Sequence, residues 1–98
     1  MGESTLSATV TVANRQGLHL RPADLFVKTA KQFDAQIEVV KDALRVDGKS
    51  ILDITTLGAA QGTQLAIIAI GEDAQAALDA LVELIEQRLP QDDHEPVE

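Results

Sequence analysis

The sequence predicts an α+β fold, an open-faced sandwich in which three helices cover one face of a four-stranded antiparallel sheet. Two apolar patterns alternate along the 98 residues. Some segments have a period of two, which is typical of half-buried strands, and others place apolar residues three or four apart, which is typical of amphipathic helices. Their order is β-α-β-β-α-β-α, with no internal repeat and no linker, so we expect one domain with one core.

The first strand and the first helix are predicted on either side of a glycine-containing loop. Residues 6–13 alternate apolar and small polar side chains, as a strand exposed on one face does. The loop contains Gly17, and Pro22 suits the first turn of the helix that follows, because that position needs no backbone N–H. The helix has a core-facing stripe made of Ala23, Phe26, Val27, Ala30 and Phe33.

A hairpin and a short helix are predicted next. Residues 37–40 and 44–46 favour two strands with a turn near Asp42, and Asp47 with Gly48 forms a turn signal that ends the hairpin. Ser50 suits the N-cap of a helix of under two turns, because an acidic residue, Asp53, stands three positions on.

The last strand and the last helix are the most apolar segments of the chain. Residues 64–70 are rich in isoleucine and predict a buried strand that ends at Gly71. Asp73 can cap the helix that follows, and we expect that helix to continue to Leu89 and to stop at Pro90. Its apolar face is long, with Ala74, Ala77, Leu78, Leu81, Leu84, Ile85 and Leu89.

These patterns define the expected boundaries. We expect an N-terminal extension at residues 1–5, a domain at 6–89, and an acidic, disordered tail at 90–98. The first residues carry neither a basic stretch nor an apolar run, so they do not predict a secretory signal. No cysteine is present, which fits a cytoplasmic protein.

The charge balance argues against several kinds of partner. Sixteen acidic residues against eight basic ones give a formal net charge of −8, which repels polyphosphate backbones and anionic membranes. We therefore expect neither nucleic-acid binding nor membrane insertion. No histidine pair has metal-ligand spacing and no glycine-rich phosphate loop is present, so we expect no metal and no cofactor.

His19 is the strongest candidate for chemistry. His94 lies in the expected tail, but His19 stands at the junction of the loop and the first helix, where backbone N–H groups and the helix dipole favour an anion. Arg21 and Arg15 are close enough in sequence to contact the same anion. A neutral imidazole is a nucleophile near pH 7, and phosphoryl transfer needs mainly positioning and charge stabilisation. On the residues alone, a single histidine before a helix is more often a helix cap or a plain surface residue than a nucleophile, so that interpretation stays open.

Three segments resemble one protein family. They are Gly17-Leu18-His19-Leu20-Arg21-Pro22-Ala23 with Phe26-Val27-Lys28, then Gly48-Lys49-Ser50-Ile51-Leu52, and then Gly71-Glu72-Asp73-Ala74. They resemble HPr, the histidine-containing phosphocarrier of the bacterial phosphoenolpyruvate-dependent phosphotransferase system, over about residues 6 to 89. The resemblance implies a phosphocarrier in sugar transport and carbon regulation that has no independent turnover of a small molecule.

The resemblance also implies roles for the residues of the first segment. His19 accepts a phosphoryl group on Nδ1 from phosphorylated enzyme I and passes it to an enzyme IIA-type acceptor. Arg21 stabilises the phosphoryl group, and the helix N-terminus around Pro22 and Ala23, with Arg15, supports it. The protein is then expected to act as a monomer.

The second segment implies regulation and docking. Ser50 matches a serine that an HPr kinase/phosphorylase modifies in some members, which signals carbon status to a transcriptional regulator; its other interpretation, a plain N-cap, is compatible. Phosphate there adds negative charge to the docking face. Partner docking is expected at Leu20, Ile51, Leu52 and Thr55, although Ile51 and Leu52 can also be partly core.

Some residues depart from the common pattern of that family. Leu20 is bulkier than the usual alanine, Asp24 adds an acid to the first helical turn that can compete for Arg21, and Asp53 and Thr55 stand near the docking patch. Because charge complementarity decides partner choice, two alternatives stay open. One is a carrier of the nitrogen branch, and the other is a regulatory binding module on the same fold.

Overall fold

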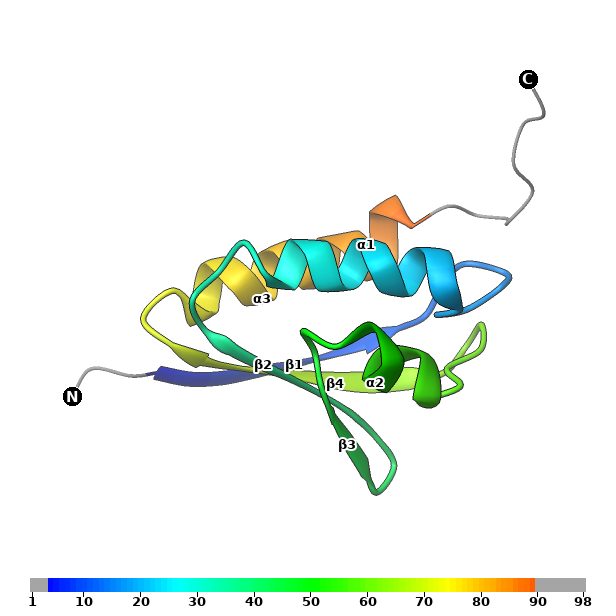
Figure 1. Ribbon diagram of the computed structural model, residues 1–98, viewed down its shortest axis with the longest axis horizontal. Helices are drawn as coiled ribbons and strands as arrows, with labels where there is room; N and C mark the ends of the chain where they lie inside the picture. Colours follow the sequence, from blue (N-terminus) through cyan, green and yellow to red (C-terminus); the bar gives the residue numbers. More distant parts are fainter. Residues whose placement is uncertain (1–3, 90–98) are drawn as a thin grey trace.

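The computed structural model of the chain describes residues 4–89, in the predicted order of elements (Figure 1). Residues 1–3 of the expected extension at 1–5 lie outside this part, and so does the expected tail at 90–98 with Pro90 and His94. The elements are β1 (Ser4–Thr11), α1 (Leu20–Ala30), β2 (Gln36–Lys41), β3 (Leu44–Asp47), α2 (Ile51–Thr56), β4 (Gln64–Gly71), α3 (Ala74–Glu83) and a π-helical turn, η1 (Leu84–Arg88).

The four strands form one antiparallel sheet in the order β1-β4-β2-β3, which confirms the predicted α+β open-faced sandwich. The helices cover one face of the sheet (Figure 1). Strand β1 begins at Ser4, which pairs with Gly71, so the strand starts two residues before the predicted segment. The last pair of this ladder is Thr11 with Gln64, and one bond in the same register follows it, from the amide of Val12 to the carbonyl of Thr63 at 2.9 Å.

The core lies between the sheet and the helices. Every second residue of the strands points into it, because successive side chains alternate between the two faces of a sheet. The fully buried side chains include Val10 on β1, Phe26 on α1, and a central strip of aliphatic residues, Ile37, Val39, Leu65 and Ile67. This one-sided core orients α1 and α2 over the sheet, and the functional site lies at their ends.

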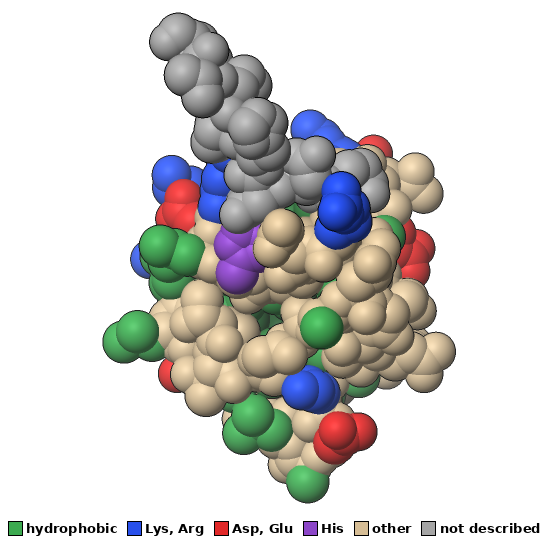
Figure 2. All heavy atoms as spheres, turned by 90° about the vertical axis from the view of Figure 1, so that its right-hand side faces the viewer, with side chains coloured by type: hydrophobic (Ala, Val, Ile, Leu, Met, Phe, Trp, Pro, Cys, Tyr) green, Lys and Arg blue, Asp and Glu red, His purple; other side chains and the backbone are tan. Residues whose placement is uncertain are grey.

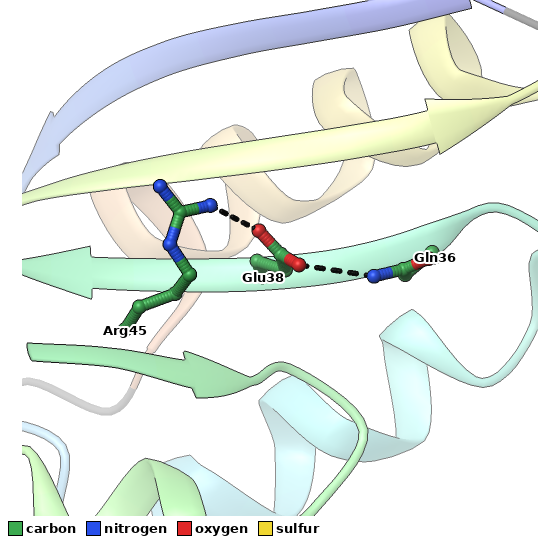
Figure 3. A network of polar contacts seen from close by, with 3 residues as sticks. All are labelled: Gln36, Glu38 and Arg45. Atoms are coloured by element: carbon green, nitrogen blue, oxygen red, sulfur yellow. Dashed lines mark hydrogen bonds and ion pairs between the residues drawn. The ribbon is translucent and has the colours of Figure 1, made fainter.

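The opposite face of the sheet is polar at its β2–β3 side. Arg45 forms an ion pair and a hydrogen bond with Glu38, and the same carboxylate accepts a hydrogen bond from the amide group of Gln36 at 3.0 Å (Figure 3). Glu38 and Arg45 lie on neighbouring antiparallel strands. This face therefore carries a polar network in place of a second hydrophobic layer.

Two predictions about the last helix are wrong. Asp73 occupies the N-cap position of α3, but its carboxylate makes no capping bond and instead accepts from the amides of Asp34 and Ala35, both at 2.8 Å. The helix also does not run on as one α-helix to Leu89. It widens into η1, which the amide of Leu89 closes by donating to the carbonyl of Leu84 at 3.0 Å, and both of these leucines stay buried.

Candidate functional site

The loop that carries His19 is fixed by a second loop from far along the chain. The amide of Leu18 donates to the carbonyl of Ala59 at 2.8 Å, and the amide of Gly62 donates to the carbonyl of Val12 at the same distance. The side chain of Gln61 donates to the carbonyl of Ala13 at 3.0 Å. The segment before α1 is therefore held at both of its ends by residues 59–63.

Gly17 allows this close approach. Its φ is +73°, a left-handed conformation that side chains disfavour, and a Cβ placed on it would stand 2.2 Å from the carbonyl oxygen of Ala59. A residue with a side chain would push the two loops apart two positions before His19. Gly17 is thus required for two reasons: its left-handed backbone conformation, and the lack of space for a Cβ atom beside Ala59.

Asn14 also holds the loop before α1 in place, a role that the sequence did not predict. Its side chain is only 1% exposed and donates from Nδ2 to the carbonyl of Gly17 at 2.8 Å, while the amide of Gly17 donates back to the Asn14 carbonyl at 3.2 Å. The burial of this polar side chain depends on the packing of the two loops, and nothing in the local pattern signals it.

His19 is the N-cap residue of α1, as predicted from its place before the helix. Its backbone is extended, its carbonyl accepts the first helical hydrogen bond from the amide of Ala23 at 2.9 Å, and its side chain makes no capping bond. The imidazole is half-buried, and Arg21, in the first turn, is exposed. Pro22 and Ala23 are buried and hold that first turn on the core.

Arg15 is exposed in the same loop, on the N-terminal side of Gly17. The positive end of the α1 dipole and two guanidinium groups thus belong to one loop–helix junction. Figure 2 shows this end of the molecule, with the histidine side chain at the surface and basic side chains on either side of it.

The position of Asp24 corrects one prediction. Helix α1 begins at Leu20, so its first turn contains no acidic residue and Asp24 lies just beyond it. The Asp24 carboxylate pairs with Lys28 one turn along the helix, at 3.1 Å. This pair gives Asp24 a partner on its own helix, on the side away from the N-terminus.

A hollow of about 250 Å³ lies beside the imidazole of His19. Leu18 and His19 line one side of it, and Thr55, Gly58 and Ala59 line the other. The Thr55 hydroxyl donates within its own helix, to the carbonyl of Ile51 at 3.0 Å. The structure therefore brings the predicted docking residue Thr55 to the same hollow as the predicted phosphoryl acceptor.

Two of the predicted docking residues are apolar and highly exposed. Leu20 is 67% exposed on α1 and Leu52 is 78% exposed on α2, and these two helices pack against each other. Ile51 is only half-buried and packs against the core, so the partly-core interpretation holds for it and not for Leu52. The exposure of both leucines leaves them accessible to another protein, and their docking role stays a prediction.

Ser50 is the N-cap of α2, as predicted. Its Oγ accepts from the amide of Asp53 at 3.2 Å, and its side chain is half-buried. The Asp53 carboxylate accepts from the amide of Asp47 at 3.1 Å, so it does not complete a reciprocal capping box with Ser50. Lys49, the residue before the cap, donates to the carbonyl of Phe33 at 2.8 Å and ties the start of α2 to the segment after α1.

Neither a metal site nor a membrane span is found in residues 4–89. No group of three or more His, Asp or Glu side chains gathers there in a way that could hold a metal ion. No helix in the same range is long and apolar enough to cross a membrane.

Solved structures of HPr proteins have this fold. The crystal structure of HPr from Thermoanaerobacter tengcongensis matches with a TM-score of 0.82 at 46% sequence identity, covering 85% of this chain and 93% of that one. Another structure from the same organism is an HPr dimer, and Crh from Bacillus subtilis forms an intertwined dimer by domain swapping. The predicted monomeric state of this chain therefore stays a prediction.

The sequence comparisons agree with the structural ones. The phosphocarrier protein HPr of Treponema pallidum is 39% identical over 84 residues, which are 86% of this chain and 96% of that protein. HPr of Borreliella burgdorferi is 46% identical over 70 residues, 71% of this chain and 81% of that protein. The family model of the PTS HPr component phosphorylation site matches residues 6–87. This chain therefore belongs to the HPr family of phosphocarrier proteins of the phosphotransferase system.

Proposed function

We propose that this protein accepts a phosphoryl group on Nδ1 of His19 from phosphorylated enzyme I and passes it to enzyme IIA-type acceptors. The observation that carries the proposal is the position of His19. It is the N-cap of α1, with Arg21 in the first turn, in a chain of the HPr family. The site needs no cofactor for this transfer, because the donor protein supplies the phosphoryl group.

The transfer is a displacement at phosphorus. The Nδ1 lone pair of the neutral imidazole forms a P–N bond while the bond between phosphorus and the donor breaks, and the proton of the ring stays on Nε2. The phosphoryl oxygens then face the first-turn amides of α1 and the Arg21 guanidinium, which stabilise their negative charge. In the second transfer the acceptor attacks phosphorus and His19 is the leaving group.

The docking surface for both partners consists of the exposed Leu20 and Leu52, with the half-buried Thr55, which lines the hollow, and the half-buried Ile51. Donor and acceptor must use this surface in turn, because each must reach the same imidazole. The expected site of action is the cytoplasm, where a soluble carrier meets its partners, and the transferring species is expected to be a monomer.

Labelling tests the acceptor residue. The full chain is incubated with phosphoenolpyruvate and an enzyme I, and the bound phosphate is assayed for the acid lability of a phosphohistidine. His19→Ala must lose the label, whereas His94→Ala must keep it. Arg21→Ala must still take up label, but at a rate lowered about tenfold or more, since one charge-stabilising group is lost. Equal labelling of His19→Ala and the parent would refute the assignment.

Regulation through Ser50 is the finer part of the proposal. Its hydroxyl accepts a bond from Asp53, so the O–H proton is not used in the cap and phosphorylation there adds about −1.5 to −2 charges beside Leu52. An assay with ATP and an HPr kinase/phosphorylase, comparing Ser50→Ala, tests whether this serine is modified, and the modified form can then be tested for binding to a transcriptional regulator.

The branch of the system is decided by the acceptor. Transfer to sugar-type and nitrogen-type IIA proteins, measured side by side, separates sugar import from the nitrogen branch. A chain that bound its partners but transferred phosphate to neither would be the regulatory module. Asp53 and Thr55 depart from the common pattern of the family. Variants in which they are replaced by small or apolar residues should be included in that comparison of acceptors.

A further inference from the structure

A second concave surface lies on the other flank of the molecule, between β1 and α3. This groove has a volume of about 650 Å³. Its apolar part is formed by Leu6 and Ala8 of β1 and by Leu78 and Val82 of α3. Leu6, Ala8 and Val82 are only partly buried, so apolar surface is accessible in the groove.

The groove opens along a free strand edge. In the sheet order β1-β4-β2-β3, β1 is an edge strand, and within residues 4–89 its one partner strand is β4, along Ser4–Thr11. Every second residue of an edge strand directs its N–H and C=O away from the sheet, and such an edge can pair with an added strand. Ser7 also lines the groove, which places the groove at this edge.

The outer rim of the groove is acidic. Asp79, Glu83 and Glu86 line it and are exposed, and in the part of the chain that the structure describes no Lys or Arg lines the groove. Asp79 accepts a hydrogen bond from the side chain of Gln75 at 2.8 Å, so its carboxylate is held at the rim. Asp79 and Glu83 come directly after Leu78 and Val82 in α3, and Glu86 stands about one turn further on, in η1. All five residues line the groove.

We propose that this groove binds an extended, basic segment of a partner protein that adds a strand to the free edge of β1. The aliphatic stems of its Lys or Arg side chains would cover Leu78 and Val82, and their charged heads would reach Asp79, Glu83 and Glu86. Apolar side chains at alternate positions of the segment would contact Leu6 and Ala8.

Charge excludes the occupants that this chain itself could offer. Residues 90–98 contain four acidic residues and no Lys or Arg, so they are repelled by the rim. The strand edge of a second copy, with the sequence Ser-Thr-Leu-Ser-Ala-Thr-Val-Thr, brings no positive charge, and a second copy carries the same net charge of −8.

The groove shares no lining residue with the hollow beside His19. The His19 site lies at the N-terminus of α1 and against α2, whereas the groove lies along the outer flank of α3. A partner bound in the groove would therefore leave the imidazole accessible, so the protein can be held by one partner while it exchanges phosphate with another. This second binding surface does not depend on phosphoryl transfer to His19.

The probe is a nine-residue peptide with blocked ends, Thr-Lys-Thr-Leu-Thr-Lys-Thr-Val-Thr, added to the full chain labelled with ¹⁵N. The expected result is a set of amide chemical-shift changes confined to residues 4–11 and 74–87, with the signals around His19 unmoved. A peptide with N-methyl groups at alternate backbone positions, which cannot pair as a strand, is expected to bind at least about fivefold more weakly. Equal binding of the two peptides would overturn strand addition.

Two triple variants that each remove three negative charges distinguish binding by the acidic rim from binding by the net charge of the protein. The triple variant Asp79→Asn, Glu83→Gln, Glu86→Gln is expected to lower the affinity at least about fivefold. The control Asp34→Asn, Asp42→Asn, Glu72→Gln has the same net charge, and its affinity is expected to stay within twofold of the parent. Equal weakening by both variants would mean that the peptide binds by net charge alone, and the proposal would be wrong.

Two further readouts complete the test. The rim variant is expected to accept phosphate from enzyme I at the parental rate, because the groove lies apart from His19. Light scattering of the chain alone at rising concentration tests the competing occupant. A dimer whose amide shifts change along β1 would assign the edge to a second copy and overturn the proposal.

Discussion

Gly17→Ala tests whether the backbone frame under His19 depends on the close approach of two loops. The substitution has two costs. A side chain at φ +73° costs about 1–2 kcal/mol in the left-handed region. The new methyl group would also stand 2.2 Å from the Ala59 oxygen and 2.9 Å from the Ala60 Cα, and both are backbone atoms that no side-chain rotation can move.

The loops must therefore separate, and the bond from the Leu18 amide to the Ala59 carbonyl is lost, at about 0.5–1.5 kcal/mol. The expected total is about 2–3 kcal/mol of unfolding free energy. Gly62→Ala is the matched control, because Gly62 has a φ of +88° but nothing within 4 Å of its Cβ position. It has only the conformational cost of about 1–2 kcal/mol.

Urea unfolding, followed by circular dichroism, measures this difference. With a slope of about 1 kcal/mol per molar for a domain of this size, the midpoint is expected to fall by about 2–3 M in Gly17→Ala and by about 1–2 M in Gly62→Ala. Acceptance of phosphate from enzyme I is expected to slow at least about tenfold in Gly17→Ala alone, since only this change displaces the residue before His19. Equal destabilisation and equal transfer rates in the two variants would refute the role given to the contact.

Three further changes test other parts of the structure. Asn14→Asp keeps the shape of the side chain but replaces the donor to the Gly17 carbonyl by a buried charge. The free energy of unfolding, measured in urea at pH 7, is expected to fall by about 3 kcal/mol. The control Asn14→Ala removes the donor without adding a charge and is expected to lower it by about 1–2 kcal/mol. Asp73→Asn leaves one side-chain oxygen where two now accept hydrogen bonds from the amides of Asp34 and Ala35. Hydrogen exchange of these two amides is expected to become faster, and the free energy of unfolding is expected to fall by about 1–2 kcal/mol. The control Glu72→Gln is expected to change neither the exchange nor the stability. Leu52→Ala is expected to leave the stability within about 0.5 kcal/mol and to raise the apparent KM for at least one partner protein; unchanged transfer to every partner would remove Leu52 from the docking surface.

The elements of the fold were predictable because each depends on a local pattern. The alternation along β1 and the stripe that includes Phe26 reflect which side chains face one core, and that property repeats along the chain with the period of the element. The N-cap at Ser50 was predictable for the same reason, since the cap and its partner Asp53 stand three residues apart. The position of His19 before a helix also follows from its immediate neighbours.

The wrong predictions depend on partners that are distant in the sequence. Asp73 fits a capping pattern, but two amides 38 and 39 residues away bind its carboxylate, and no local rule signals them. The burial of Asn14 likewise follows from the contact of its loop with residues 59–63. The correction at Asp24 has a local cause instead. The prediction placed Pro22 in the first turn without fixing the first helical residue, and because the helix begins at Leu20 that turn ends before Asp24.

The site thus has two kinds of residues with different consequences for the phosphocarrier. Gly17, Asn14 and the carbonyl of Ala59 set where the imidazole stands. Under the proposed function, a change in this frame is expected to alter every transfer through His19, whichever protein is the donor or acceptor. Leu20 and Leu52 are exposed and support little of the core, so a change at these proposed docking residues is expected to alter the affinity for individual partners. The departures from the family pattern at Leu20, Asp53 and Thr55 all belong to this second kind or lie next to it. Partner choice can therefore diverge within the family while the chemistry of the histidine stays the same.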